Sequence, residues 1–178
     1  MIYAIVPVAS IGLELTPENA ARLTRAGEMI KHATREQFPT KHHTLDYHGP
    51  DILAFTGPPP PGSPADAANA VVMSTRAFSW EDETTWKGNI DRSPCGSGTS
   101  AIMALRHSRG ELSVGDTFTH ESLIGSLFEG VVTALKDDGG HTSIVPSIKG
   151  TAWITQLCTV VLDPTDPFPS GYTLGDIW

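Results

Sequence analysis

The thiol of Cys95 is the side chain of this sequence best placed to do chemistry. It lies in the segment Asp91–Ser100, which reads Asp-Arg-Ser-Pro-Cys-Gly-Ser-Gly-Thr-Ser and is followed at once by the helix-forming run Ala101–His107. A helix that begins here leaves its first backbone N–H groups without intrahelical partners and points the positive end of its dipole toward the thiol. Both effects favour a thiolate, which can remove a proton from carbon or attack carbon directly.

The amides of Gly96, Ser97 and Gly98 could bind a substrate carboxylate beside this thiol. Cys95 also has a second interpretation, as a buried structural residue at a tight helix entry. A small apolar thiol needs no glycine-rich surroundings in order to pack, so the pattern favours the functional interpretation. The sequence therefore predicts a reactive thiol and an anion site in one place.

The charge and the cysteine content of the chain indicate which partners and which cellular location to expect. The 178 residues carry a formal net charge of −8, and no basic run exceeds two residues, which argues against a nucleic-acid surface and favours a small-molecule or protein partner. Cys95 and Cys158 are not in a paired spacing, so we expect no disulfide framework, and a thiol that must stay reduced favours the cytoplasm. We expect no membrane span and no signal peptide, because no apolar run is long enough and the N-terminal stretch lacks a basic region.

The segment Lys41–His48 contains three histidines and Asp46, and it has two interpretations. Imidazoles and a carboxylate can ligate a metal, but adjacent histidines in a strand point to opposite faces and no helical pair supports them. We therefore favour a solvated hairpin, and we expect neither a metal nor a cofactor.

Hydrophobic patterning predicts a single α+β domain over residues 1–178. Helices are expected at Pro17–Arg35, which has a threonine N-cap and a proline at its first position, and at Gly98–Ser108, which ends before Gly110. Strands are expected at Ile2–Val8, Asp51–Phe55, Ala70–Ser74, Thr117–Ser122, Leu127–Leu135, Ser143–Ile148 and Thr151–Leu162. One helix-backed and strongly bent sheet fits this order.

The segment Asp91–Ala101 is similar to the second active-site segment of the proline racemase and hydroxyproline epimerase family. The similarity continues through Gly115–Phe118, Glu121–Gly130, Gly150–Thr155 and Leu162–Tyr172, while Tyr3–Val6 and Leu13–Leu15 resemble the start of the second half of these enzymes. The resemblance therefore covers nearly the whole chain, but only the second of the two similar lobes from which the family is built.

This resemblance implies a single lobe of a diaminopimelate-epimerase-like fold, with a bent mixed sheet wrapped on a central helix. In the family each lobe gives one cysteine, and the two thiols face opposite sides of the substrate α-carbon without any cofactor. The resemblance implies that Cys95 is the acid/base. It also implies that Asp91 contacts the substrate ammonium; the alternative for Asp91 is that it caps the turn. Asp51 falls where the epimerases usually offer a histidine to the ring substituent of the substrate; a strand-edge carboxylate in water is its alternative.

Three functions fit a single lobe. The first is a racemase or epimerase that works as a homodimer, in which a C2 interface brings two Cys95 thiols across one cleft. The second is a one-base lyase, dehydratase or cyclisation catalyst. The third is a truncated, non-catalytic chain or a subunit that joins a complementary first-lobe chain. The expected substrate, a proline-like imino acid or an amino acid carboxylate, comes from the resemblance alone. Cys95, rather than Cys158 in its apolar strand, is expected to be the reactive thiol.

Overall fold

The computed structural model describes residues 1–171 of the chain. Its elements are β1 (Tyr3–Pro7), α1 (Ala20–Gln37), β2 (Thr40–Lys41), β3 (His48–Gly49), β4 (Ile52–Gly57), β5 (Ala67–Ser74), β6 (Gly88–Ile90), α2 (Gly96–Ser108), β7 (Thr117–Ser122), β8 (Leu127–Asp138) and β9 (His141–Lys149). The first helix begins later than expected because Pro17–Asn19 forms a 3-10 turn ahead of it. No helix within the described residues is long and apolar enough to cross a membrane.

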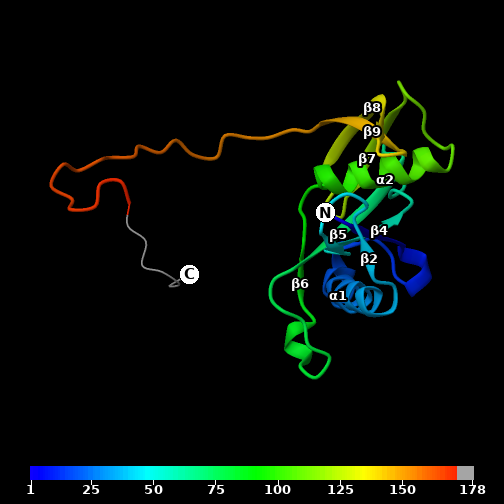
Figure 1. Ribbon diagram of the computed structural model, residues 1–178, viewed down its shortest axis with the longest axis horizontal. Coiled ribbons are helices and arrows are strands. Elements are labelled where there is room, and N and C mark those ends of the chain that lie inside the picture. The colour runs from blue at the N-terminus through cyan, green and yellow to red at the C-terminus, as the bar shows by residue number, and fades with distance from the viewer. Residues whose placement is uncertain (172–178) are drawn as a thin grey trace.

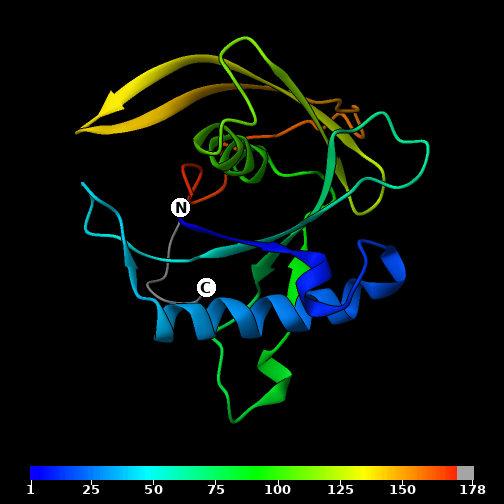
Figure 2. The same ribbon diagram turned by 90° about the vertical axis from the view of Figure 1, so that its right-hand side faces the viewer.

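The main sheet is mixed and follows the order β1-β4-β5-β7-β8-β9, with β6 paired to β5. The pairs β1–β4 and β5–β7 are parallel, whereas the other neighbours are antiparallel. In Figure 2 the sheet curls around α2, while α1 lies against its other face. This arrangement confirms the predicted α+β class and the bent sheet wrapped on a central helix.

Two apolar cores lie on opposite faces of the sheet, because alternate residues of a strand point to opposite sides. Leu23, Phe55 and Val72 belong to the core under α1, whereas Val71 and Met103 belong to the core around α2. The side chains of the adjacent residues Val71 and Val72 therefore anchor β5 to the two helices from opposite sides. Burial on both faces explains why this strand is almost entirely apolar.

The buried face of α1 also carries an ion pair that the sequence analysis did not predict. Lys31 Nζ donates to Glu28 Oε1 at 2.7 Å and to Ser74 Oγ at 2.6 Å, and Ser74 Oγ donates to Glu28 Oε2 at 2.9 Å. Lys31 is 0 % exposed and Glu28 is 1 % exposed. Burial lowers the pKa of Lys31, while the adjacent carboxylate of Glu28 opposes that shift.

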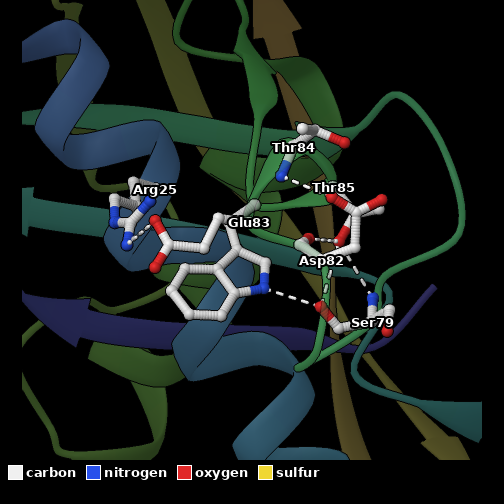
Figure 3. Close-up of polar contacts among 7 residues, drawn as sticks. Arg25, Ser79, Asp82, Glu83, Thr84 and Thr85 are labelled. Atoms are coloured by element: carbon white, nitrogen blue, oxygen red, sulfur yellow. Dashed lines mark hydrogen bonds and ion pairs between the residues drawn. The ribbon is translucent and has the colours of Figure 1, made fainter.

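The loop between β5 and β6 folds back onto α1 (Figure 3). The Arg25 guanidinium donates to the Glu83 carboxylate at 3.0 Å, and it lies 4.4 Å from the ring centre of Trp86. Within the loop, Asp82 Oδ1 accepts a bond from the Thr84 amide at 2.9 Å. These contacts hold the loop against the helix, and so they help to place β6, the strand that leads into the candidate site.

Residues 151–171 form no helix or strand and are exposed throughout. The strand expected at Thr151–Leu162 is therefore wrong. Figure 1 shows this segment leaving the end of β9 and running away from the body of the chain, so the extended backbone lies beside no strand with which it could pair. The last residue of the family-like signature, Tyr172, lies outside the described residues.

Large apolar side chains of this segment remain in solvent. Trp153 is 77 % exposed, Ile154 is 88 % exposed and Leu157 is 93 % exposed. Cys158 is exposed as well, so the expectation that it lies within an apolar strand is wrong. The segment has the apolar character of a buried strand without the neighbouring strand that would bury it.

Candidate active site

Cys95 immediately precedes α2 in a backbone conformation that side chains seldom adopt. Its φ is 63° and its ψ is 123°, and within residues 1–171 it is the one residue other than glycine with a positive φ. A conformation of this kind costs about 1–3 kcal/mol and persists only where the surrounding structure holds it. Strained residues cluster at active sites, so the backbone singles out Cys95 independently of its motif.

The first amides of α2 face no protein acceptor. In the described part of the chain, the Thr99 amide bonds to Cys95 O at 2.8 Å, but the amides of Gly96, Ser97 and Gly98 make no hydrogen bond to the protein. They are therefore available to an anion next to the thiol, and the binding of a substrate carboxylate there stays a prediction.

The two glycines of this turn have different steric roles. A Cβ at Gly98 would lie 3.2 Å from Cys95 Cβ and 3.2 Å from Val71 Cγ2, so a side chain there would press on the thiol-bearing residue. A Cβ at Gly96 would meet no atom within 4 Å. Gly98 therefore allows Cys95 to pack closely against α2, whereas Gly96 borders open space in which a ligand can lie.

Two hydroxyl groups lie beside the thiol. The Tyr3 hydroxyl, from β1, is 3.5 Å from Cys95 Sγ and 2.8 Å from Ser97 Oγ, and Ser97 Oγ is itself 3.5 Å from the sulfur. Burial raises the pKa of Tyr3, and its contact with Cys95 raises it further. Tyr3 is thus a neutral hydrogen-bond donor in the range where enzymes work, and it can donate to a thiolate at Cys95.

Asp91 caps the turn that precedes the thiol. Its Oδ1 accepts bonds from the Ser93 amide at 2.9 Å and the Ser93 hydroxyl at 3.0 Å, and Ser93 Oγ accepts a bond from the Cys95 amide at 3.2 Å. Asp91 and Ser93 also line a cavity of about 720 Å³, together with parts of the segments 124–128 and 151–155, although Cys95 is not among its lining residues. The capping interpretation of Asp91 fits these contacts, and its contact with a substrate ammonium stays a prediction.

Asp51 lies in a different environment from Asp91. Its Oδ2 accepts a bond from the Ile2 amide at 2.9 Å, and its side chain lines a separate cavity of about 400 Å³ with Arg35 and Arg76. Burial raises the pKa of Asp51, but hydrogen bonds from Ile2 and Tyr47 outweigh that effect and lower it. The structure therefore joins Asp91, Cys95 and the three amides in one turn, and it does not place Asp51 in the same cavity.

Three buried polar side chains from separate elements lie behind the Pro94–Cys95 peptide. Pro94 O accepts bonds from Asn69 Nδ2 at 2.8 Å and from Thr99 Oγ1 at 3.2 Å. Thr99 Oγ1 lies 3.0 Å from Nδ1 of His120. Asn69, Thr99 and His120 are each 0 % exposed.

The single hydroxyl proton of Thr99 links the imidazole of His120 to the Pro94 carbonyl. When the hydroxyl donates to Pro94 O, it accepts from the imidazole, and this arrangement requires the tautomer of His120 that carries its proton on Nδ1. The other ring nitrogen, Nε2, is buried and has no partner among the described residues. Burial, aided by the charge of Arg106, lowers the pKa of His120 to about 4.

The sequence analysis did not identify Tyr3, Asn69 or His120 as site residues. One local signal was present, because Asn69 is a lone polar residue inside the apolar strand Ala67–Val72. No comparable signal marks Tyr3 or His120, which reach the site from strands far away in the sequence. Within the described residues, no group of three or more His, Cys, Asp or Glu side chains could hold a metal ion.

The chain is similar to known proteins over nearly all of its length. The family model described as Proline racemase matches residues 1–173. The 4-hydroxyproline 2-epimerase of Rhizobium etli is 36% identical over 180 residues, which cover 100% of this chain and 48% of that protein. Proline racemase A of Trypanosoma cruzi is 34% identical over 185 residues, which cover 97% of this chain and 41% of that protein.

The chain is also similar to solved structures. A crystal structure of a hydroxyproline epimerase from Agrobacterium vitis, with bound trans-4-hydroxy-L-proline, matches with a TM-score of 0.73 and 32% identity. That match covers 99% of this chain and 47% of the other. The chain thus spans about half the length of the curated relatives and solved structures that it matches.

Proposed function

The chain belongs to the proline racemase family, and from this premise we propose that it supplies Cys95 as a thiol acid/base to an isomerase. The isomerase racemises or epimerises the α-carbon of a proline-like imino acid. The observation that carries the proposal is the strained conformation of Cys95 beside three free helix amides. Such an arrangement holds a nucleophilic or basic atom next to a site for negative charge.

The proposed step is proton transfer from carbon to sulfur. The Cys95 thiolate takes the α-proton, the C–H bond breaks, and its electron pair remains on carbon and is shared with the substrate carboxylate. That carboxylate lies against the amides of Gly96, Ser97 and Gly98, which stabilise the charge that grows on it in the transition state. Asp91 contacts the substrate ammonium, as the family resemblance implies. The resemblance also gives the ring substituent to Asp51, but that side chain lines a different cavity from Asp91, so it takes no part in the proposed step.

A second thiol returns a proton to the opposite face of the carbon, so that the configuration inverts without a cofactor. We propose that it comes from a second copy of this chain in a homodimer, or from a complementary first-lobe subunit. The exposed apolar segment 151–162 supports an assembly of this kind, because large apolar surfaces rarely stay in water. A thiol that must stay reduced also makes the cytoplasm the proposed location.

One observation favours a second candidate function. Within the described residues the only other thiol is Cys158, which lies in the exposed segment after β9 rather than beside Cys95. A single base is enough for a lyase, dehydratase or cyclisation catalyst, because the carbanion then expels a leaving group or takes its proton back on the same face.

Proton NMR in deuterated water separates these functions. The wild-type chain is incubated with L-proline and with each 4-hydroxyproline epimer, alone and with a first-lobe protein of the family. Inversion with deuterium incorporation supports the two-thiol isomerase, whereas exchange with retained configuration or an alkene signal supports a one-base reaction. Cys95→Ser should abolish all three outcomes, since a serine hydroxyl does not ionise near neutral pH.

Cys158→Ser is the matched control for the loss of a thiol. It should leave the reaction unchanged because Cys158 lies outside the candidate site. Activity that survives Cys95→Ser but disappears in Cys158→Ser would contradict the assignment of the chemistry to Cys95. Absence of exchange with every substrate, with and without the first-lobe protein, would contradict the proposed function itself.

A further inference from the structure

We propose that Asn69, Thr99 and His120 are positioning residues that orient the Pro94–Cys95 peptide and thereby set the direction in which the Cys95 thiol points. We call these three buried side chains the clamp. Its role rests on the proposed function of Cys95. The clamp itself, however, can be tested on the thiol without any substrate.

The argument begins with the two peptide planes on either side of the Cys95 Cα. The angle φ describes how the preceding peptide is turned, and the oxygen of Pro94 lies in the plane of that peptide. Asn69 from β5 and Thr99 from α2 both bond to this oxygen, at 2.8 Å and 3.2 Å. The following peptide is held by its own oxygen, which accepts the Thr99 amide at 2.8 Å. With both planes held, the direction of the Cα–Cβ bond is fixed as well.

His120 provides the third contact of the clamp, from β7. This strand runs parallel to β5 and pairs with it, so the imidazole lies within reach of the first turn of α2. Nδ1 lies 3.0 Å from the Thr99 hydroxyl oxygen, and in the tautomer that carries a proton on Nδ1 the imidazole donates to that oxygen and turns the hydroxyl proton toward Pro94 O. Removing the imidazole donor would free that hydroxyl to rotate away from the carbonyl.

Packing alone does not explain these polar residues. The Oδ1 atom of Asn69 and the Nε2 atom of His120 are buried without a partner in the described part of the chain, which is unfavourable for the fold. Apolar side chains would fill the same space without that penalty. What the polar side chains add is their set of bonds to the peptide of a strained residue, Cys95, whose φ of 63° needs such support.

The thiol direction decides which groups surround the sulfur. In the clamped conformation Sγ lies 3.5 Å from the Tyr3 hydroxyl and 3.5 Å from Ser97 Oγ, next to the free amides of α2. If the backbone relaxed to a negative φ, Cβ and Sγ would move away from these donors. The reactivity of Cys95 should then fall while the fold remains.

The test compares the two thiols of one molecule. Native protein is treated with a limiting amount of iodoacetamide at pH 7, and mass spectrometry gives the ratio of labelling at Cys95 to labelling at Cys158. Cys158 is exposed in the segment after β9 and is an internal reference that cancels reagent concentration, while the pH is the same for every variant. We expect Thr99→Val to lower this ratio about fivefold or more, as the loss of one net hydrogen bond implies, and Thr99→Ser to restore it because the hydroxyl is kept.

A second pair of variants tests the imidazole, and a third variant controls for stability. His120→Leu should lower the ratio, whereas His120→Asn should stay near the wild-type value because its amide places an N–H donor where Nδ1 was. Val132→Ala removes buried apolar volume from the core around α2, where Val132 is 0 % exposed, but it removes none of the hydrogen bonds of the clamp. It should lower the midpoint of urea unfolding without changing the ratio.

Several results would overturn the clamp. One is an unchanged or increased ratio in folded Thr99→Val and His120→Leu, and another is an equal fall in Val132→Ala. If Thr99→Val does not fold, the comparison of Asn69→Ala with wild type replaces it, with the same expected fall. Because alkylation needs no substrate, these outcomes are independent of whether the chain moves a proton on proline, so failure of the clamp and failure of the proposed function are distinguishable.

Discussion

The buried imidazole of His120 predicts that the stability of this chain depends on pH. The pKa of His120 is about 4 in the folded chain, against 6.5 for the free side chain. The unfolded chain therefore binds a proton between these values while the folded chain does not, so stability is fully present above about pH 6.5 and is lost as the pH falls toward 4. At pH 5 this single group should have lowered the free energy of unfolding by about 2 kcal/mol, and the decrease should approach about 3 kcal/mol near pH 4.

The measurement is urea unfolding at pH 8 and at pH 5, for wild type and for His120→Asn. The variant keeps an N–H donor toward Thr99 but does not titrate, so its stability should fall by about 2 kcal/mol less than that of wild type over the same interval. Other titrating groups contribute equally to both proteins and cancel in the difference. His141→Asn makes the same replacement at an exposed histidine and is the matched control. If wild type and His120→Asn lose the same stability, the imidazole is not buried in its neutral form and the argument fails.

The remaining predictions concern the turn, the ion pair and the exposed segment. Gly98→Ala should destabilise the fold by about 1–3 kcal/mol in urea unfolding and lower the reactivity of the adjacent thiol, because the new Cβ meets atoms at 3.2 Å; Gly96→Ala, which meets no atom within 4 Å, should keep the fold. If both variants unfold at the same urea concentration, the steric distinction between these glycines is wrong. Lys31→Met should lower the free energy of unfolding by about 3–5 kcal/mol, because it leaves the Glu28 carboxylate buried without its partner. Adding Glu28→Gln should restore much of that stability. Light scattering should show a dimer or larger species because the segment 151–162 exposes its apolar side chains, and a concentration-independent monomer mass would contradict the homodimer.

Some parts of the fold could be read from the sequence because they depend on local interactions. The strand Thr117–Ser122 was predicted with the bounds that the structure has, and the helix after Cys95 was predicted to within two residues at its start. Periodic apolar residues and glycine punctuation act over a few neighbouring positions, so they are visible along the chain. For the same reason the thiol and the three amides, which belong to one continuous turn, could be named from the sequence.

Other parts depend on which segments meet in space. The segment Thr151–Leu162 has the residue types of a strand, yet it forms none because a strand needs a neighbour with which to exchange backbone hydrogen bonds, and none of the described strands lies beside it. The separation of Asp51 from Asp91 has the same origin, since the sheet assigns the two carboxylates to different cavities.

The groups of the turn, namely a thiol, three amides and the N-terminus of a helix, can thus be read along the chain. The surroundings of that thiol depend on how distant segments pack together. Tyr3 on β1, Asn69 on β5 and His120 on β7 lie far from Cys95 along the chain, and the sheet brings them to one point. The positive φ of Cys95 is a strained angle, which persists only where contacts hold it, and the bonds of Asn69 and Thr99 to Pro94 O are contacts of that kind.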